Sequence, residues 1–99
     1  MMDGFTVEDA KRFGRLLRRW AENGGEDFRI WRMATVEETG VDRIWLKIGN
    51  AAPCSRFCCA WHGDSEADVF RKAAKTLLGT PGFGDSVEEF ELLLESRGW

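Results

Sequence analysis

The sequence predicts an α+β domain in which one helix is followed by a three-stranded antiparallel meander and then by two more helices. Apolar residues recur at helical spacing in three stretches, at about 7–22, 66–78 and 87–96. Between the first two stretches lie three runs rich in β-branched and aromatic residues, separated by turn-forming residues. The order α-β-β-β-α-α and the length of 99 residues indicate a single domain over residues 1–99.

The first helix is predicted to begin at residue 7 and to end near residue 22. Thr6 and Asp9 have the spacing of a capping box, with Asp in place of the usual Glu. Apolar residues from Val7 to Ala21 then follow the 3.6-residue period, and Asn23-Gly24-Gly25 is a typical helix stop. We expect this helix to pack on the sheet through its apolar side.

Three strands are predicted in the runs FRIWRMATV, VDRIWLKIGN and CSRFCCAW. Alternation is clearest in the second run, where Ile44, Leu46 and Ile48 point to one side and the residues between them to the other. We expect the side with these three aliphatic residues to face the core, beneath the first two helices.

The last two helices are predicted at about 66–78 and 87–96. Asp64 or Ser65 caps the first of them, and Ser86 with Glu89 forms a capping box for the second. The last helix is expected on the other face of the sheet or at its edge, and the sequence leaves both positions open.

Each predicted strand carries one tryptophan, and we expect all three on the second face of the sheet together with basic residues. An aromatic, basic face of this kind indicates an interaction surface. The candidate partner-binding residues are Trp31, Trp45, Trp61, Arg29, Arg43 and Lys47. Protein partners are favoured because Trp and Arg dominate binding hot spots, and stacked single-stranded bases are the second candidate. Alternatively, the last helix or a second copy in a homodimer covers this face.

Five basic residues fall within one third of the circumference of the first helix, opposite its apolar side. They are Lys11, Arg12, Arg15, Arg18 and Arg19. This stripe is either a solvated helix face or a contact for phosphates or for an acidic protein surface. The element order, with the helix ADVFRKAAKTLL, resembles double-stranded-RNA-binding domains over residues 6–78. In that family the last helix begins with lysines, whereas this one begins Asp64-Ser65-Glu66-Ala67-Asp68.

The net charge of −3 is distributed unevenly along the chain. Residues 1–63 carry ten Lys and Arg against nine Asp and Glu, whereas residues 64–99 carry four against eight. A mildly acidic chain disfavours general nucleic-acid binding, which depends on neutralising phosphates. The last helix is a possible acidic contact through Glu88, Glu89, Glu91 and Glu95.

No pattern for catalysis or for a metal or cofactor is recognised. Cys54, Cys58, Cys59 and His62 lack the paired spacings of zinc sites, and nothing orients a Cys59–His62 nucleophile pair. We therefore expect no enzyme, no cofactor and no metal site. Three cysteines without a disulfide pattern, no signal-like N-terminus and no apolar run of ~20 residues predict a cytoplasmic protein without a membrane contact.

The stretch GDSEADVFRKAAKTLLG resembles the closing helix of small α+β proteins of phages and mobile elements. Short length, acidic balance and a dense aromatic surface are also similar to anti-CRISPR inhibitors. The resemblance implies a non-enzymatic protein-binding module in the host bacterial cytoplasm that occludes a surface of a host nucleoprotein complex. A nucleic-acid-binding domain is the alternative function, and a small cysteine-dependent enzyme is the third.

Overall fold

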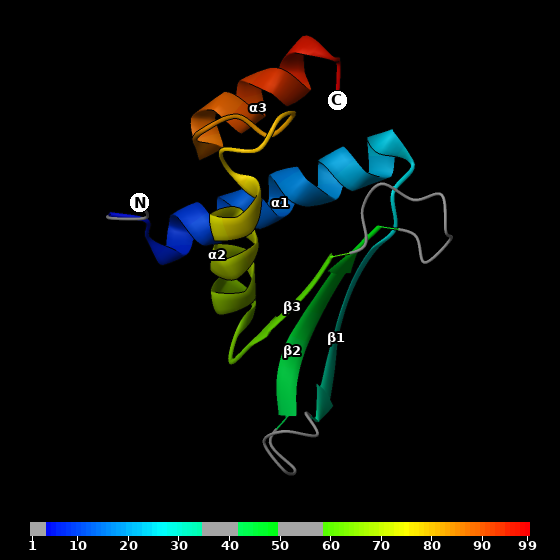
Figure 1. Ribbon diagram of the computed structural model, residues 1–99, viewed down its shortest axis with the longest axis vertical. Helices are drawn as coiled ribbons and strands as arrows, with labels where there is room; N and C mark the ends of the chain where they lie inside the picture. Colours follow the sequence, from blue (N-terminus) through cyan, green and yellow to red (C-terminus); the bar gives the residue numbers. More distant parts are fainter. Residues whose placement is uncertain (1–3, 35–41, 50–58) are drawn as a thin grey trace.

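The computed structural model describes residues 4–34, 42–49 and 59–99, and it confirms the α+β class and the order α-β-β-β-α-α (Figure 1). The elements are α1 (Val7–Gly24), β1 (Phe28–Ala34), β2 (Asp42–Ile48), β3 (Cys59–Gly63), α2 (Glu66–Leu77) and α3 (Val87–Ser96). None of the helices in the described ranges is both long enough and apolar enough to span a bilayer.

The helix starts follow the predicted caps. Thr6 and Asp9 form the full capping box of α1, and the Ser65 side chain accepts a hydrogen bond from the Asp68 backbone at the start of α2. At α3, Ser86 accepts from the Glu89 backbone N–H. The Glu89 carboxylate, however, accepts from the backbone N–H of Asp85, so the predicted capping box is only half formed. The helix ends are close to prediction, with α1 continuing to Gly24.

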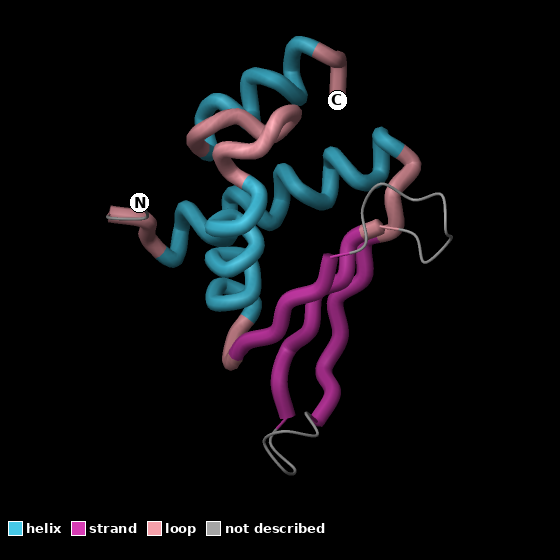
Figure 2. The backbone as a smooth tube through the Cα atoms, viewed as in Figure 1, coloured by secondary structure: helices cyan, strands magenta, loops and turns pink. Residues whose placement is uncertain are grey.

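The three strands form one antiparallel sheet in the order β1-β2-β3, so β2 is central and β3 is an edge strand (Figure 2). Trp45 of β2 lies opposite Trp31 of β1 and opposite His62 of β3. Leu46 lies opposite Ile30 and Trp61. Because residues directly opposite each other share a face, this register decides which side chains meet on each side of the sheet.

One face of the sheet packs against the helices and forms the core. Leu46 and Ile48 are 0% and 1% exposed, within a cluster that also contains Phe13 of α1 and Val69 of α2. The prediction that this side of β2 faces the core, beneath the first two helices, is confirmed. The two helices approach closely at Gly14, where an added Cβ would lie 2.5 Å from the Phe70 ring.

The last helix does not cover the second face of the sheet, and it takes neither of the two positions expected from the sequence. It packs on α1, on the side of α1 that faces away from the sheet (Figure 1). Phe90 of α3 lies 5.5 Å from Phe13, between ring centroids, and Phe83 lies 5.1 Å from Trp20. The apolar side of α3 thus packs on α1. Among the described residues, α3 therefore does not bury the tryptophans on the second face of the sheet.

Candidate functional site

None of the described helices covers the second face of the sheet, whose residues are exposed or half-buried, and we call it the open face. It is made of eight strand positions that the register places on one side: Arg29, Trp31, Met33, Arg43, Trp45, Lys47, Ala60 and His62. Three of these residues are cations, and none of the eight is an acid. Met33 has 47% of its surface exposed, which is high for a large apolar side chain on a sheet.

An aromatic row crosses the open face at right angles to the strands. Trp31 and Trp45 are stacked, with ring centroids 6.2 Å apart and an angle of 17° between the ring planes. The His62 ring continues the row on the other side, 4.6 Å from the Trp45 ring. Each strand therefore contributes one ring to a continuous π surface.

Cations lie on both sides of the aromatic row. The Arg29 guanidinium sits 4.9 Å from the centroid of the Trp31 ring, a cation–π contact, and Lys47 is its neighbour on β2. On the other side of the row, Arg43 pairs with Asp64 at 3.3 Å. A hollow of about 340 Å³ at the Arg29 end is lined by Asp27, Phe28, Arg29, Lys47 and Gly49.

Trp61 does not belong to the open face, so the prediction that the three tryptophans gather there is wrong. Trp61 packs against the core, and its Nε1 donates a 3.1 Å hydrogen bond to Thr76 Oγ1 of α2. The sequence missed this because apolar residues run without alternation from 57 to 61, so period-2 spacing could not assign a face.

His62 takes the position on the open face that was expected for Trp61. The alternation of side chains along a strand would have placed His62 there, if the sequence had shown which residues of the third strand face the core. Trp45 Nε1 and His62 Nδ1 are both buried and, in the described part of the chain, neither has a hydrogen-bond partner. Hydrogen-bonding capacity is therefore left at the centre of the aromatic row. The His62 carbonyl, in contrast, accepts a 2.8 Å hydrogen bond from Lys72 Nζ of α2.

The predicted basic stripe of α1 divides into two groups. Arg12 forms ion pairs with Glu88 and Glu91 of α3, and Arg19 donates to the carbonyl of Trp99. The hydrogen bond to Glu91 is the main cause that raises the pKa of Arg12. Two of the four acids expected as a possible contact are therefore used within the chain. A third acid, Glu89, accepts a hydrogen bond from the backbone N–H of Asp85, and Glu88, Glu89 and Glu95 are exposed.

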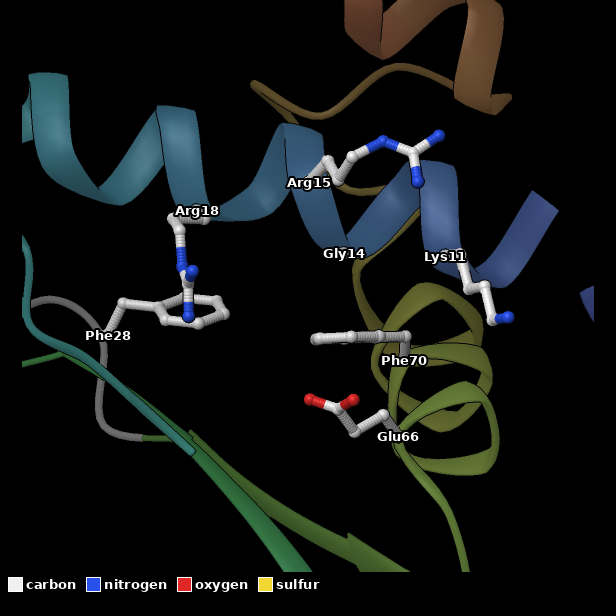
Figure 3. A pocket seen from close by; sticks show the side chains of 7 residues that line it. All are labelled: Lys11, Gly14, Arg15, Arg18, Phe28, Glu66 and Phe70. Atoms are coloured by element: carbon white, nitrogen blue, oxygen red, sulfur yellow. The ribbon is translucent and has the colours of Figure 1, made fainter. Parts of the chain in front are cut away.

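The remaining stripe residues border a groove between α1, α2 and the start of β1. It has a volume of about 240 Å³ and is lined by Lys11, Arg15, Arg18, Phe28, Glu66 and Phe70. In Figure 3 the rings of Phe28 and Phe70 and the Glu66 carboxylate border the same space, and Arg18 lies against the Phe28 ring. The side chains of Arg15 and Lys11 point away from that space. The groove lies on the helix side of the sheet, so it is separate from the open face.

Cys59 and His62 both lie on β3. Among the described residues there is no group of three His, Cys, Asp or Glu side chains that could hold a metal ion. Cys59 occupies the strand position opposite Ile48, and His62 the position opposite Trp45. Cys54 and Cys58 lie outside the described residues.

No protein-family model matches the chain, and neither a curated protein nor a solved structure matches it. The functional proposals below therefore rest on the geometry of this chain.

Proposed function

We propose that this protein is a non-catalytic binding protein and that its open face binds single-stranded nucleic acid. The aromatic row of Trp31, Trp45 and His62 between cations is the observation that carries the proposal. Single strands expose the flat faces of their bases, and proteins bind them by stacking those bases on rings of a sheet while cations contact the phosphates.

The dimensions of the row fit a short stretch of nucleic acid. Neighbouring strands lie about 4.8 Å apart, so rings on three strands span about 10 Å, enough for two or three bases. The cations Arg29 and Lys47 lie beside the row, where the sugar-phosphate backbone of a stacked strand would run. The acids of α3 do not oppose this contact, because α3 packs on α1 and away from the open face.

The composition of the open face supports a nucleic acid over a protein as its partner. Because His62 and not Trp61 lies on the open face, this face is less apolar than the sequence predicted. The basic and aromatic character of its residues favours a polyanion as the ligand.

The direct test is fluorescence anisotropy with labelled ten-nucleotide oligo-U and oligo-dT at low salt. We expect dissociation constants of about 1–100 µM, typical of binding without sequence preference. Trp45→Ala should weaken binding by about 5- to 150-fold, since stacking contributes ~1–3 kcal/mol per base. Trp61→Ala is the matched control, because it removes the same residue type from the opposite face. No anisotropy change up to about 100 µM protein contradicts the proposal.

Salt dependence gives a second readout of the same contact. Each lost phosphate contact lowers the slope of log K against log salt by about 0.7 for a single strand. We expect this change for Lys47→Gln on the open face and no change for Lys75→Gln, an exposed lysine of α2. Equal slopes for Lys47→Gln and the unaltered protein would remove Lys47 from the contact.

A protein partner is the second candidate, favoured by the exposure of Met33 beside two stacked tryptophans and an arginine. Such residues form binding hot spots, and an inhibitor that occludes a host nucleoprotein complex would use them in this way. This candidate predicts that oligonucleotides do not bind. It also predicts a partner in nuclease-treated bacterial lysate that is captured by the unaltered protein and by Trp61→Ala, but not by Trp45→Ala. Light scattering separates this outcome from a homodimer.

A further inference from the structure

The groove between α1, α2 and the start of β1 combines three chemical elements that point to a small ligand. It has cations on one wall, two aromatic rings and one carboxylate (Figure 3). It lies on the other side of the sheet from the aromatic row, so it does not depend on the function proposed for the open face.

The cations of the groove differ from the other cations of α1. Arg12 and Arg19 are bound by α3 and by the C-terminal carbonyl, respectively. Lys11, Arg15 and Arg18, in contrast, form no ion pair within the described ranges. All three line the groove. This side of α1 is therefore free to bind an anion, in particular one with several oxygens.

The aromatic rings provide a surface for a flat group. The Arg18 guanidinium lies 5.1 Å from the centroid of the Phe28 ring, which holds this cation beside the groove rather than extended into solvent. The Phe70 ring is fixed on the opposite wall, because it packs closely against Gly14 of α1. Both rings are half-buried and keep part of their surface toward the groove.

Glu66 adds a requirement that a simple anion does not meet. Its side chain is exposed at the first residue of α2 and faces the space between the rings. A carboxylate is an acceptor only, so it favours a ligand that presents N–H or O–H donors. A plain phosphate or carboxylate would be repelled by Glu66 and would leave the rings unused.

We propose that this groove binds a mononucleotide, with the base against Phe28 and Phe70, the base edge on Glu66, and the phosphate on Arg18. The volume of about 240 Å³ is below the ~300–1,000 Å³ usual for ligand pockets, and it suits a ligand of this size whose phosphate stays at the rim. Guanine is the favoured base, because its adjacent N1–H and N2–H groups donate together to one carboxylate. Adenine offers only its amino group at the corresponding edge.

The experiment is an NMR titration of the ¹⁵N-labelled protein with GMP, AMP, guanosine and inorganic phosphate. We expect GMP to bind with a dissociation constant of about 10 µM to 1 mM, as its size allows. AMP, guanosine and phosphate should each bind at least tenfold more weakly. The shifted amide signals should include those of residues 14–18, 28 and 66.

Variants separate the groove from other sites. Arg18→Gln and Glu66→Gln should each weaken GMP binding at least tenfold, and Glu66→Gln should also reduce the preference for GMP over AMP. Both side chains are exposed, so folding should persist, which thermal melts check. Lys75→Gln is the charge-matched control and should bind GMP normally.

Four results would overturn the proposal: no GMP binding up to several millimolar, phosphate binding as tight as GMP, affinity unaffected by Arg18→Gln and Glu66→Gln, or GMP binding lost in Trp45→Ala. The last result would place GMP on the open face. Titration of Trp45→Ala with a 5′-phosphorylated guanosine trinucleotide shows whether the groove binds a free nucleotide or the 5′ end of a strand. If oligonucleotides do not bind the open face, the proposal for the groove is unaffected. If GMP does not bind, the function proposed for the open face is unaffected.

Discussion

The two faces of the sheet use the same residue type for opposite purposes. Trp61 on the covered face packs against the core and donates its Nε1 hydrogen to Thr76. Trp45, on the adjacent strand, lies on the open face between Trp31 and His62, and its Nε1 has no partner among the described residues. On the covered face the aromatic side chain stabilises the fold, whereas on the open face the aromatic side chains are available to bind a ligand. Neither composition nor residue type separates the two roles; only the strand register does.

The largest difference between the faces is expected for neighbouring residues of β2. Leu46→Ala should lower the free energy of unfolding by about 2–5 kcal/mol, because it leaves a cavity in a fully buried site. Lys47→Ala, on the open face, should change it by less than about 0.5 kcal/mol. Urea denaturation measures both, and equal losses would show that the open face is also packed in solution.

Gly14 probes the close packing of the covered side. Alanine normally stabilises a helix by about 1 kcal/mol relative to glycine, but here its Cβ would overlap the Phe70 ring. Overpacking of this kind costs about 1–3 kcal/mol, so Gly14→Ala should be destabilising. Gly24→Ala is the control, since its Cβ would meet only Trp99, at 3.7 Å. A stabilising Gly14→Ala would mean that α1 and α2 lie further apart.

Replacing each tryptophan with phenylalanine tests their polar groups. Trp61→Phe keeps most of the packing and loses the hydrogen bond to Thr76, which should cost about 0.5–1.5 kcal/mol. Trp45→Phe removes an N–H that has no partner in the described residues, so it should be neutral or slightly stabilising. Guanidinium denaturation compares them, and a larger loss for Trp45→Phe would contradict the assignment of the two faces.

The smallest expected effect is at the junction of β3 and α2, and it depends on pH. The hydrogen bond from Arg71 is the main cause that lowers the pKa of Asp68. A lowered pKa stabilises the fold above the unfolded value of about 3.9, and this contribution disappears as the pH falls through the folded-state pKa. Asp68→Asn should therefore cost less than about 1 kcal/mol at pH 7, and this cost should shrink as the pH falls below about 3.9. A cost that does not shrink as the pH falls would indicate a packing role instead.

The fold could be predicted from the sequence where local signals agree. For α1, the capping residues Thr6 and Asp9, the apolar period and the glycine stop all predicted the same helix, and the structure confirms it. The side of β2 that faces the core was readable because Ile44, Leu46 and Ile48 alternate with charged residues and Trp45.

The candidate site was only partly predictable, because its composition depends on contacts between distant segments. The face of Trp61 follows from the register of β3, and the apolar residues around it carry no alternation that could fix it. The basic stripe of α1 is a regular pattern, yet only the packing of α3 shows that Arg12 is used for ion pairs and that Arg18 borders a groove.

The hydrogen bond from Lys72 to the His62 carbonyl has a consequence for behaviour at high concentration. β3 is an edge strand, and unpaired backbone groups on such an edge are a template for pairing with another chain. Lys72 Nζ binds the His62 carbonyl of this strand, and its side chain, which is 40% exposed and lies 3.4 Å from Asp68, keeps a charge beside β3. A lysine at an edge strand disfavours pairing with another chain, so we expect the lysine that joins α2 to the sheet also to oppose aggregation along β3.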